Sequence, residues 1–238
     1  ISYSSLSLKN EFFFNKILSM FAPETKRNII VSKVYMNVKD KIIIKSDSLF
    51  RKFGIRGVTI DDICSELGIS KKTIYTYFDD KHSIALESIK YYWSGLLNEI
   101  GKIKKTSKNS IHFFIELSNF FRQTITHINP LFVHDLKKFH PDLFKITHDL
   151  KKKVFIKTLS NNIKRGKKEG FIRQTVDEII ITKLRLEEIE LAFDQNLFPY
   201  KKFDIINVQL QFFDHFMRGI LTNEGLKIYE KSFLKYIK

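Results

Sequence analysis

Two short helical patterns joined by a glycine, between Thr59 and Phe78, constrain the fold more than any other part of this chain. The first pattern starts after Thr59, a favoured N-cap residue, and has carboxylates in its first turn, where the helix dipole stabilises them. Gly68 ends it, because glycine readily adopts the left-handed conformation that follows a helix. Ser70 is placed to cap a second helix that runs to Phe78. Two helices joined by so tight a turn are typical of the helix-turn-helix motif.

The second helix of this motif carries side chains that suit DNA. Ser70 leaves the N-terminus of the helix facing outward, so that its backbone N–H groups and the positive end of its dipole can meet an anion. Long cations, hydroxyls and aromatic edges follow, and these reach phosphates and base edges in a major groove. The residues predicted to contact DNA from this helix are Ser70, Lys71, Lys72, Thr73, Tyr75, Thr76 and Tyr77.

Helical periodicity continues on both sides of the motif. Upstream, apolar residues recur at three- and four-residue steps from Ile42 to Phe53, and Gly54 is expected to form a left-handed cap. Downstream, Asp80 is expected to cap a long helix that reaches Ile100. No segment alternates between apolar and polar residues, so the predicted fold class is all-α, with a small head and a larger body. The further predicted helices span residues 111–128, 130–139, 141–169, 176–197, 204–221 and 224–236.

Charge indicates an anionic partner but does not identify it. The chain has 41 Lys and Arg against 26 Asp and Glu, a formal net charge of +15, which favours nucleic acid or an acidic membrane surface. Residues 36–82 hold nine Lys and Arg against seven Asp and Glu, so only +2 of this charge lies there. Most of it lies in the body, where lysines crowd residues 137–168. We interpret those lysines as a solvated face in preference to a second nucleic-acid surface.

Several classes of protein and site are absent from the sequence. One cysteine excludes an internal disulfide framework and a multi-cysteine metal site, and no run of 18 apolar residues predicts a membrane span. No hydrolase, nucleotide-binding or H-E-x-x-H motif is present, and His134, Asp135 and His140 are poorly spaced for a metal. We therefore predict no enzyme activity, no catalytic or metal-binding residues and no cofactor. The alternative is a basic helical protein that binds membrane surfaces or nucleic acid non-specifically.

The first 35 residues differ from the rest of the chain. They begin with a serine-rich stretch, and Lys9, Asn10 and Glu11 interrupt the apolar residues that a signal peptide would need. Met36 lies just before the first strongly periodic segment. We expect the natural protein to begin at Met36 and residues 1–35 to be an atypical N-terminal extension.

The segment from Met36 to His82 resembles the N-terminal domain of the TetR family of bacterial transcriptional regulators. The resemblance implies a three-helix DNA-binding head at residues 36–82 and an all-helical ligand-binding and dimerisation body at residues 83–238. It also implies a cytoplasmic homodimer, usually a repressor, that binds a pseudo-palindromic operator in double-stranded DNA and responds to a small-molecule effector. The matching positions are Ile42-Ile43, Leu49-Phe50, Gly54, Thr59-Ile60-Asp61-Asp62-Ile63, Leu67 to Phe78 and Lys81, with no insertion.

Matched positions imply roles for single residues. Thr59 corresponds to a helix cap that often touches a phosphate, and Lys81 to a phosphate-binding lysine at the start of the fourth helix. Tyr75 and Tyr77 correspond to aromatic positions that commonly meet the DNA backbone. In sequence order, the helices at 176–197 and 204–221 correspond to the intersubunit four-helix bundle. In the body, an aromatic-lined effector cavity and ordinary core remain equal interpretations of Trp93, Phe113, Phe114, Leu117 and Phe121.

Overall fold

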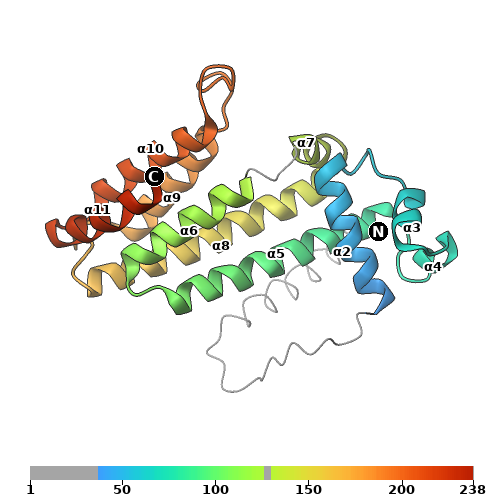
Figure 1. The fold of residues 1–238 in the computed structure, drawn as a ribbon, viewed down its shortest axis with the longest axis horizontal. Helices are drawn as coiled ribbons and strands as arrows, with labels where there is room; N and C mark the ends of the chain where they lie inside the picture. Colours follow the sequence, from blue (N-terminus) through green and yellow to red (C-terminus); the bar gives the residue numbers. More distant parts are fainter. Residues whose placement is uncertain (1–36, 126–129, 238) are drawn as a thin grey trace, which may run out of the picture.

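The computed structural model describes residues 37–125 and 130–237, and these residues fold into the helices α2 to α11 (Figure 1). Apart from one isolated bridge between Ile172 and Leu221, the described residues contain no β-structure. The predicted all-α fold class is confirmed. The helices are α2 (Val38–Phe53), α3 (Ile60–Leu67), α4 (Lys71–Tyr75), α5 (Lys81–Thr106), α6 (Ser110–Ile125), α7 (Pro130–Phe139), α8 (Pro141–Lys168), α9 (Glu178–Leu191), α10 (Ile205–Ile220) and α11 (Asn223–Ile237).

The described range does not include the start of the chain. The expected extension at residues 1–35 and the proposed start at Met36 lie outside it. Among the helices that the structure describes, none combines the length and the apolar character needed to cross a membrane.

The helices of the head begin where their capping residues predict. Thr59 and Asp62 form a reciprocal capping box in which each side chain accepts from the backbone N–H of the other. The Ser70 hydroxyl accepts from the Thr73 N–H at 3.1 Å, and the Asp80 carboxylate accepts from the Ser83 N–H at 2.7 Å. These caps satisfy backbone donors that have no partner inside the helix, which fixes the starts of α3, α4 and α5.

The ends of three predicted elements need correction. The helix predicted to run from 176 to 197 ends at Leu191, because the Asp194 carbonyl accepts from the N–H groups of Leu197 and Phe198 in a separate turn. That segment forms a loop that projects from the bundle between α9 and α10 (Figure 1). The helix predicted at 70–78 is regular only to Tyr75 and continues as a turn. Gly54 has a positive φ of 79°, but its ψ of 158° is not that of a left-handed helical cap.

The long helices of the body carry the head at one end. α5, α6 and α8 run along the length of the molecule, while α9, α10 and α11 cover the end away from α3 and α4 (Figure 1). One continuous cluster of buried apolar side chains runs from the head into the body. It includes Ile42, Phe50, Ile63 and Ile74 in the head and Trp93, Ile111, Leu143 and Ile163 in the body.

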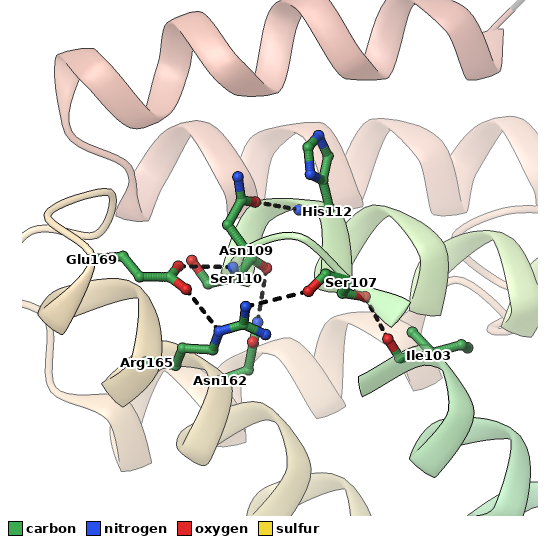
Figure 2. Close-up of polar contacts among 8 residues, drawn as sticks. All are labelled: Ile103, Ser107, Asn109, Ser110, His112, Asn162, Arg165 and Glu169. Carbon is green, nitrogen blue, oxygen red and sulfur yellow. Dashed lines mark hydrogen bonds and ion pairs between the residues drawn. The ribbon is translucent and has the colours of Figure 1, made fainter. Parts of the chain in front are cut away.

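A polar network fastens the turn between α5 and α6 to the last part of α8 (Figure 2). The Ser110 N–H donates to the Glu169 carboxylate at 2.8 Å, and the Ser110 carbonyl accepts from the Asn162 side chain at 2.9 Å. The Arg165 guanidinium donates to Glu169 at 2.7 Å and to the Ser107 carbonyl at 3.3 Å. We call this group, Ser107, Ser110, Asn162, Arg165 and Glu169, the distal corner. It holds the far end of α5 against α8.

Candidate nucleic-acid interface

Of the residues that were predicted to contact DNA, Thr73 and Lys81 are partly buried and the others are exposed. Ile74 and Phe78 are buried and anchor α4 and the turn that follows it against the head. The side chains between them point outward as a result, and those of Tyr75 and Tyr77 are 53% and 42% exposed. Aromatic residues exposed to this degree beside lysines and hydroxyls are suited to pack against a nucleic-acid backbone. Thr59 and Ser70 to Thr73 lie on the same head (Figure 1).

The two lysines of α4 differ in their surroundings. The Lys71 ammonium lies 2.9 Å from the Asp61 carboxylate of α3, and the hydrogen bond and charge of Asp61 raise the pKa of Lys71. Lys72 is exposed and has no ion-pair partner among the described residues. Lys72 can therefore meet a phosphate without first giving up a carboxylate.

Thr59 is at the surface, with its hydroxyl already engaged. That hydroxyl donates to the Asp62 carboxylate at 2.7 Å and accepts from the Asp62 N–H at 3.1 Å. The hydrogen bonds from Thr59 lower the pKa of Asp62, which therefore stays negative. A phosphate contact at Thr59 would lie beside this carboxylate.

The structure gives Lys81 a role that the sequence did not predict. Its ammonium donates to the carbonyl oxygens of Ile55 and Val58, at 3.1 and 2.9 Å, and so ties the start of α5 to the loop between α2 and α3. Burial lowers its pKa, against the opposing charges of Asp135 and Asp62. An ammonium has three donors, so one N–H remains for a phosphate.

A cluster of polar side chains joins the head to the body, and the sequence did not indicate it. The buried Asp135 of α7 accepts from the Arg56 N–H at 2.8 Å. His82, in the first turn of α5, contacts His140 and Asp142 at the start of α8. We call the group formed by Arg56, Lys81, His82, Asp135, His140 and Asp142 the head–body junction. These residues are far apart in sequence, so no local spacing pattern could reveal them.

The predicted effector residues lie within the body. Trp93, Phe113, Phe114 and Leu117 are buried, and the partly buried Phe121 packs on Phe155 with ring centroids 4.7 Å apart. The Trp93 indole N–H is buried with no hydrogen-bond partner among the described residues. A small pocket lies elsewhere, between α10 and α11, and none of the five predicted residues lines it. Its lining is Asn207, Leu210, Gln211, Asp214, Arg218, Glu230 and Phe233.

The capped recognition helix and its exposed face define a helix-turn-helix protein of the DNA-binding class. Residues 42–87 match the family described as "Bacterial regulatory proteins, tetR family". This match places a TetR-type DNA-binding domain at residues 42–87.

Two curated relatives match part of the chain. The biofilm operon icaADBC HTH-type negative transcriptional regulator IcaR of Staphylococcus aureus is 39% identical over 74 residues, covering 31% of this chain and 40% of IcaR. The uncharacterized HTH-type transcriptional regulator YerO of Bacillus subtilis is 37% identical over 67 residues, covering 28% of this chain and 23% of YerO. The chain thus spans less than half the length of these relatives in the matched region.

Solved structures share the fold over most of the chain. A putative transcriptional regulator from Saccharomonospora viridis, in complex with choline, has a TM-score of 0.64 at 20% identity and covers 78% of this chain and 98% of its own. A TetR-family regulator from Cytophaga hutchinsonii has a TM-score of 0.62 at 17% identity and covers 78% and 95%. At such low identity, the likeness establishes the fold of head and body together.

Proposed function

We propose that this protein is a sequence-specific DNA-binding transcriptional repressor. The observation that carries the proposal is the outward face of the motif, where Lys72, Tyr75 and Tyr77 are exposed beside the capped start of α4. The similarity of 74 residues of this chain to IcaR, a negative transcriptional regulator, favours repression. In this proposal residues 36–82 form the DNA-binding domain, residues 83–238 form the regulatory domain, and the protein acts in the cytoplasm without enzyme activity.

The proposed DNA-contacting residues are those the sequence indicated. Ser70, Lys71, Lys72 and Thr73 meet base edges and phosphates at the start of α4, while Thr76 and the two tyrosines contact the backbone beyond it. Thr59 and Lys81 contribute at the edge of the interface. Lys72 contributes more than Lys71 because its ammonium is not shared with a carboxylate.

A homodimer supplies a second head for the second half-site of an operator, which one head cannot cover. Exposed apolar side chains gather on α9 and the loop that follows it, and such a concentration marks an interaction surface. α10 turns the polar residues Asn207, Gln211 and His215 outward, so the proposed interface through α9 and α10 combines both kinds of contact. The exposed apolar residues are Ile179, Ile180, Leu184, Leu191, Phe193, Leu197, Tyr200 and Phe203.

A small-molecule effector completes the proposal. The buried, unpartnered N–H of Trp93 supports a binding site in the body, because a ligand acceptor there would satisfy an otherwise costly donor. Phe113, Phe114, Leu117 and Phe121 would supply its apolar walls. Binding in the body would change the spacing of the two heads through α5, which joins head and body.

Gel shifts with the protein's own upstream DNA, with random DNA as competitor, test the proposal. We expect specific retardation, and we expect Lys72→Ala to weaken it about tenfold, since a charge-assisted hydrogen bond is worth roughly 1.5 kcal/mol or more. In Lys72→Ala, the slope of the logarithm of affinity against the logarithm of salt concentration should also fall by about one for each head, because one phosphate contact is lost. Lys71→Ala should have the smaller effect.

Lys105→Ala, at the exposed C-terminal end of α5, is the matched control and should bind like the unmodified protein. Non-specific retardation that modest salt abolishes, with equal behaviour of Lys72→Ala and Lys105→Ala, would contradict the proposal. That result would favour a basic surface without sequence specificity.

A further inference from the structure

Two histidines from distant parts of the chain meet at the head–body junction. The Nδ1 atoms of His82 and His140 lie 3.1 Å apart, and the Nε2 atom of His82 lies 2.9 Å from the Asp142 carboxylate. His82 belongs to the first turn of α5, five residues after Tyr77 of the recognition motif. His140 occupies the N-cap position of α8, between α7 and α8, and its side chain makes no capping hydrogen bond. The pair therefore joins the DNA-binding head directly to the body.

Charged groups on every neighbouring element face this pair. Lys81 of α5, Asp142 of α8 and Asp135 of α7 act on His140 through their charges. Asp135 also accepts from the Arg56 N–H of the loop between α2 and α3. The Arg56 guanidinium lies over the Phe139 ring, 4.8 Å from its centroid. His134 lies 3.7 Å from Asp135 and is mostly exposed. Among these charges, Asp142 and Asp135 favour the protonated form of His140, whereas Lys81 and a protonated His82 oppose it.

Hydrogen-bond roles at the pair follow from its geometry. With both rings neutral, His82 donates from Nε2 to Asp142 and accepts at Nδ1 from the Nδ1–H of His140. A first added proton can occupy the outer nitrogen of His140 and leave these contacts intact. A second added proton places an N–H on both facing nitrogens, so that two donors oppose each other at 3.1 Å. The contact then has no acceptor and becomes repulsive.

We propose that the His82–His140 pair is a pH-sensitive contact that holds the head to the body, closed with at most one added proton and open when both rings are cationic. Opening breaks the His82–His140 contact, while the cationic His82 keeps its ion pair with Asp142. The first turn of α5 is then held to the start of α8 by one of these two contacts, so the heads lose their fixed orientation and specific DNA affinity falls. This last step rests on the proposed function.

The two imidazole rings are poorly arranged to bind a metal ion. Zinc and similar ions take three or more protein ligands, and no group of three suitable side chains occurs in the parts of the chain that the structure describes. Asp142 contacts the far nitrogen of His82 and cannot share a metal with the facing nitrogens.

The direction of the pH effect follows from linkage. Burial, and then the neighbouring imidazole of His82, lowers the pKa of His140 below its ordinary 6.5. The unfolded or opened state therefore binds protons more readily than the closed junction below pH 6.5. The closed junction is fully stable above that pH and loses stability as the pH falls.

Hydrogen exchange at the junction tests the contact without requiring any DNA. Protection factors of the Arg56 amide, corrected for chemical exchange, should fall several-fold between about pH 7.5 and about pH 5 in the unmodified protein. His140→Asn keeps a donor and an acceptor near the Nδ1 position but does not titrate, so its protection should change less than about twofold. His215→Asn, at an exposed histidine, is the control and should behave like the unmodified protein. Equal pH dependence in His140→Asn and the unmodified protein would overturn the proposal.

Nitrogen chemical shifts of histidine in the unmodified protein give a test that requires no variant. At neutral pH, His140 should carry its proton on Nδ1 and His82 on Nε2, and the second protonation should occur well below the first. Two independent titrations near pH 6.5 would overturn the proposal.

Gel shifts at several pH values then test the link to DNA. Added positive charge alone strengthens DNA binding, whereas opening of the junction should weaken specific binding about tenfold between about pH 7.5 and about pH 5.5. His140→Asn should lose less than about threefold. An equal loss in both proteins would overturn the link. Absence of specific binding at every pH would instead reject the proposed function, and hydrogen exchange would still decide whether the pair opens.

Discussion

α5 is held at both ends by polar groups, but the two ends use different chemistry. At the distal corner, fixed donors from Asn162 and Arg165 meet backbone carbonyls, and the carboxylates are those of Glu169 and of Glu116, which accepts from the Ser107 hydroxyl. At the head–body junction, two imidazoles face each other and a lysine is partly desolvated. A network of permanent donors and acceptors keeps one geometry over a wide pH range, whereas facing imidazoles exchange their roles near neutral pH. α5 is therefore anchored at the distal corner and adjustable at the head–body junction.

The largest effect is expected from Asp135→Ala at the junction. The variant leaves the Arg56 N–H without an acceptor and removes a negative charge that faces Lys81. We expect a loss of about 2–3 kcal/mol in stability, since the Arg56 N–H loses its acceptor and the partly buried Lys81 loses a neighbouring negative charge. Thermal unfolding would measure it, with Asp149→Ala on the exposed face of α8 as the control. A loss no larger than that of the control would mean that the junction contributes nothing to stability.

A smaller effect is expected from Gly166→Ala at the distal corner. A Cβ atom there would lie 2.5 Å from the Cδ1 atom of Ile172, which is 1% exposed, and 2.8 Å from the Ser110 hydroxyl. Overpacking outweighs the better helix propensity of alanine, so we expect a net loss of about 1–2 kcal/mol.

Gly95→Ala on α5 is the matched glycine control, because nothing lies within 4 Å of its Cβ position. Thermal unfolding should show a gain of roughly 0.5–1 kcal/mol for this variant. Equal stabilisation by both substitutions would show that the corner is loosely packed and would remove the contrast between the two ends.

The smallest effect on stability is expected from Glu169, the carboxylate of the distal corner that binds Ser110 and Arg165. Burial alone would raise the pKa of Glu169, but Ser110 and Arg165 outweigh it and hold that pKa below 4.5. Because its folded pKa is lowered, the carboxylate stabilises the protein above pH 4.5, and this contribution is lost as the pH falls through the folded value. Glu169→Gln should therefore cost about 0.5–1 kcal/mol near neutral pH and nothing in strong acid.

Thermal unfolding of this variant and of the unmodified protein from about pH 7.5 to about pH 3 would measure the difference. It should stay constant through the range in which His140 titrates and shrink only below pH 4.5. A difference that shrinks already near pH 6 would show that both ends respond to the same protons.

The head was predictable because its decisive contacts are local. Thr59, Ser70 and Asp80 each bind a backbone N–H three residues ahead, so their roles follow from sequence order alone. The end of α9 was mispredicted because the apolar pattern continues to Leu197, while Asp194 closes a turn through hydrogen bonds that apolar periodicity does not reveal.

The junction was not predictable from any such rule. His82 and His140 are 58 positions apart, and their contact depends on where the turn between α7 and α8 lies against the head. The sequence indicated a phosphate role for Lys81 by its position, but the two carbonyls that it binds become visible only once the loop before α3 is placed. The predicted contacts of Lys71, Lys72 and the tyrosines with DNA remain predictions.

Because α5 is one continuous helix of 26 residues, it is about 39 Å long and acts as a lever. With its far end fixed at the distal corner, a rotation of about 5° would move its first turn by about 3 Å. That displacement is comparable with the roughly 3.4 Å rise between base pairs along DNA. If the proposed opening of the junction allowed a rotation of this size, the head would move by about one base-pair step along the groove.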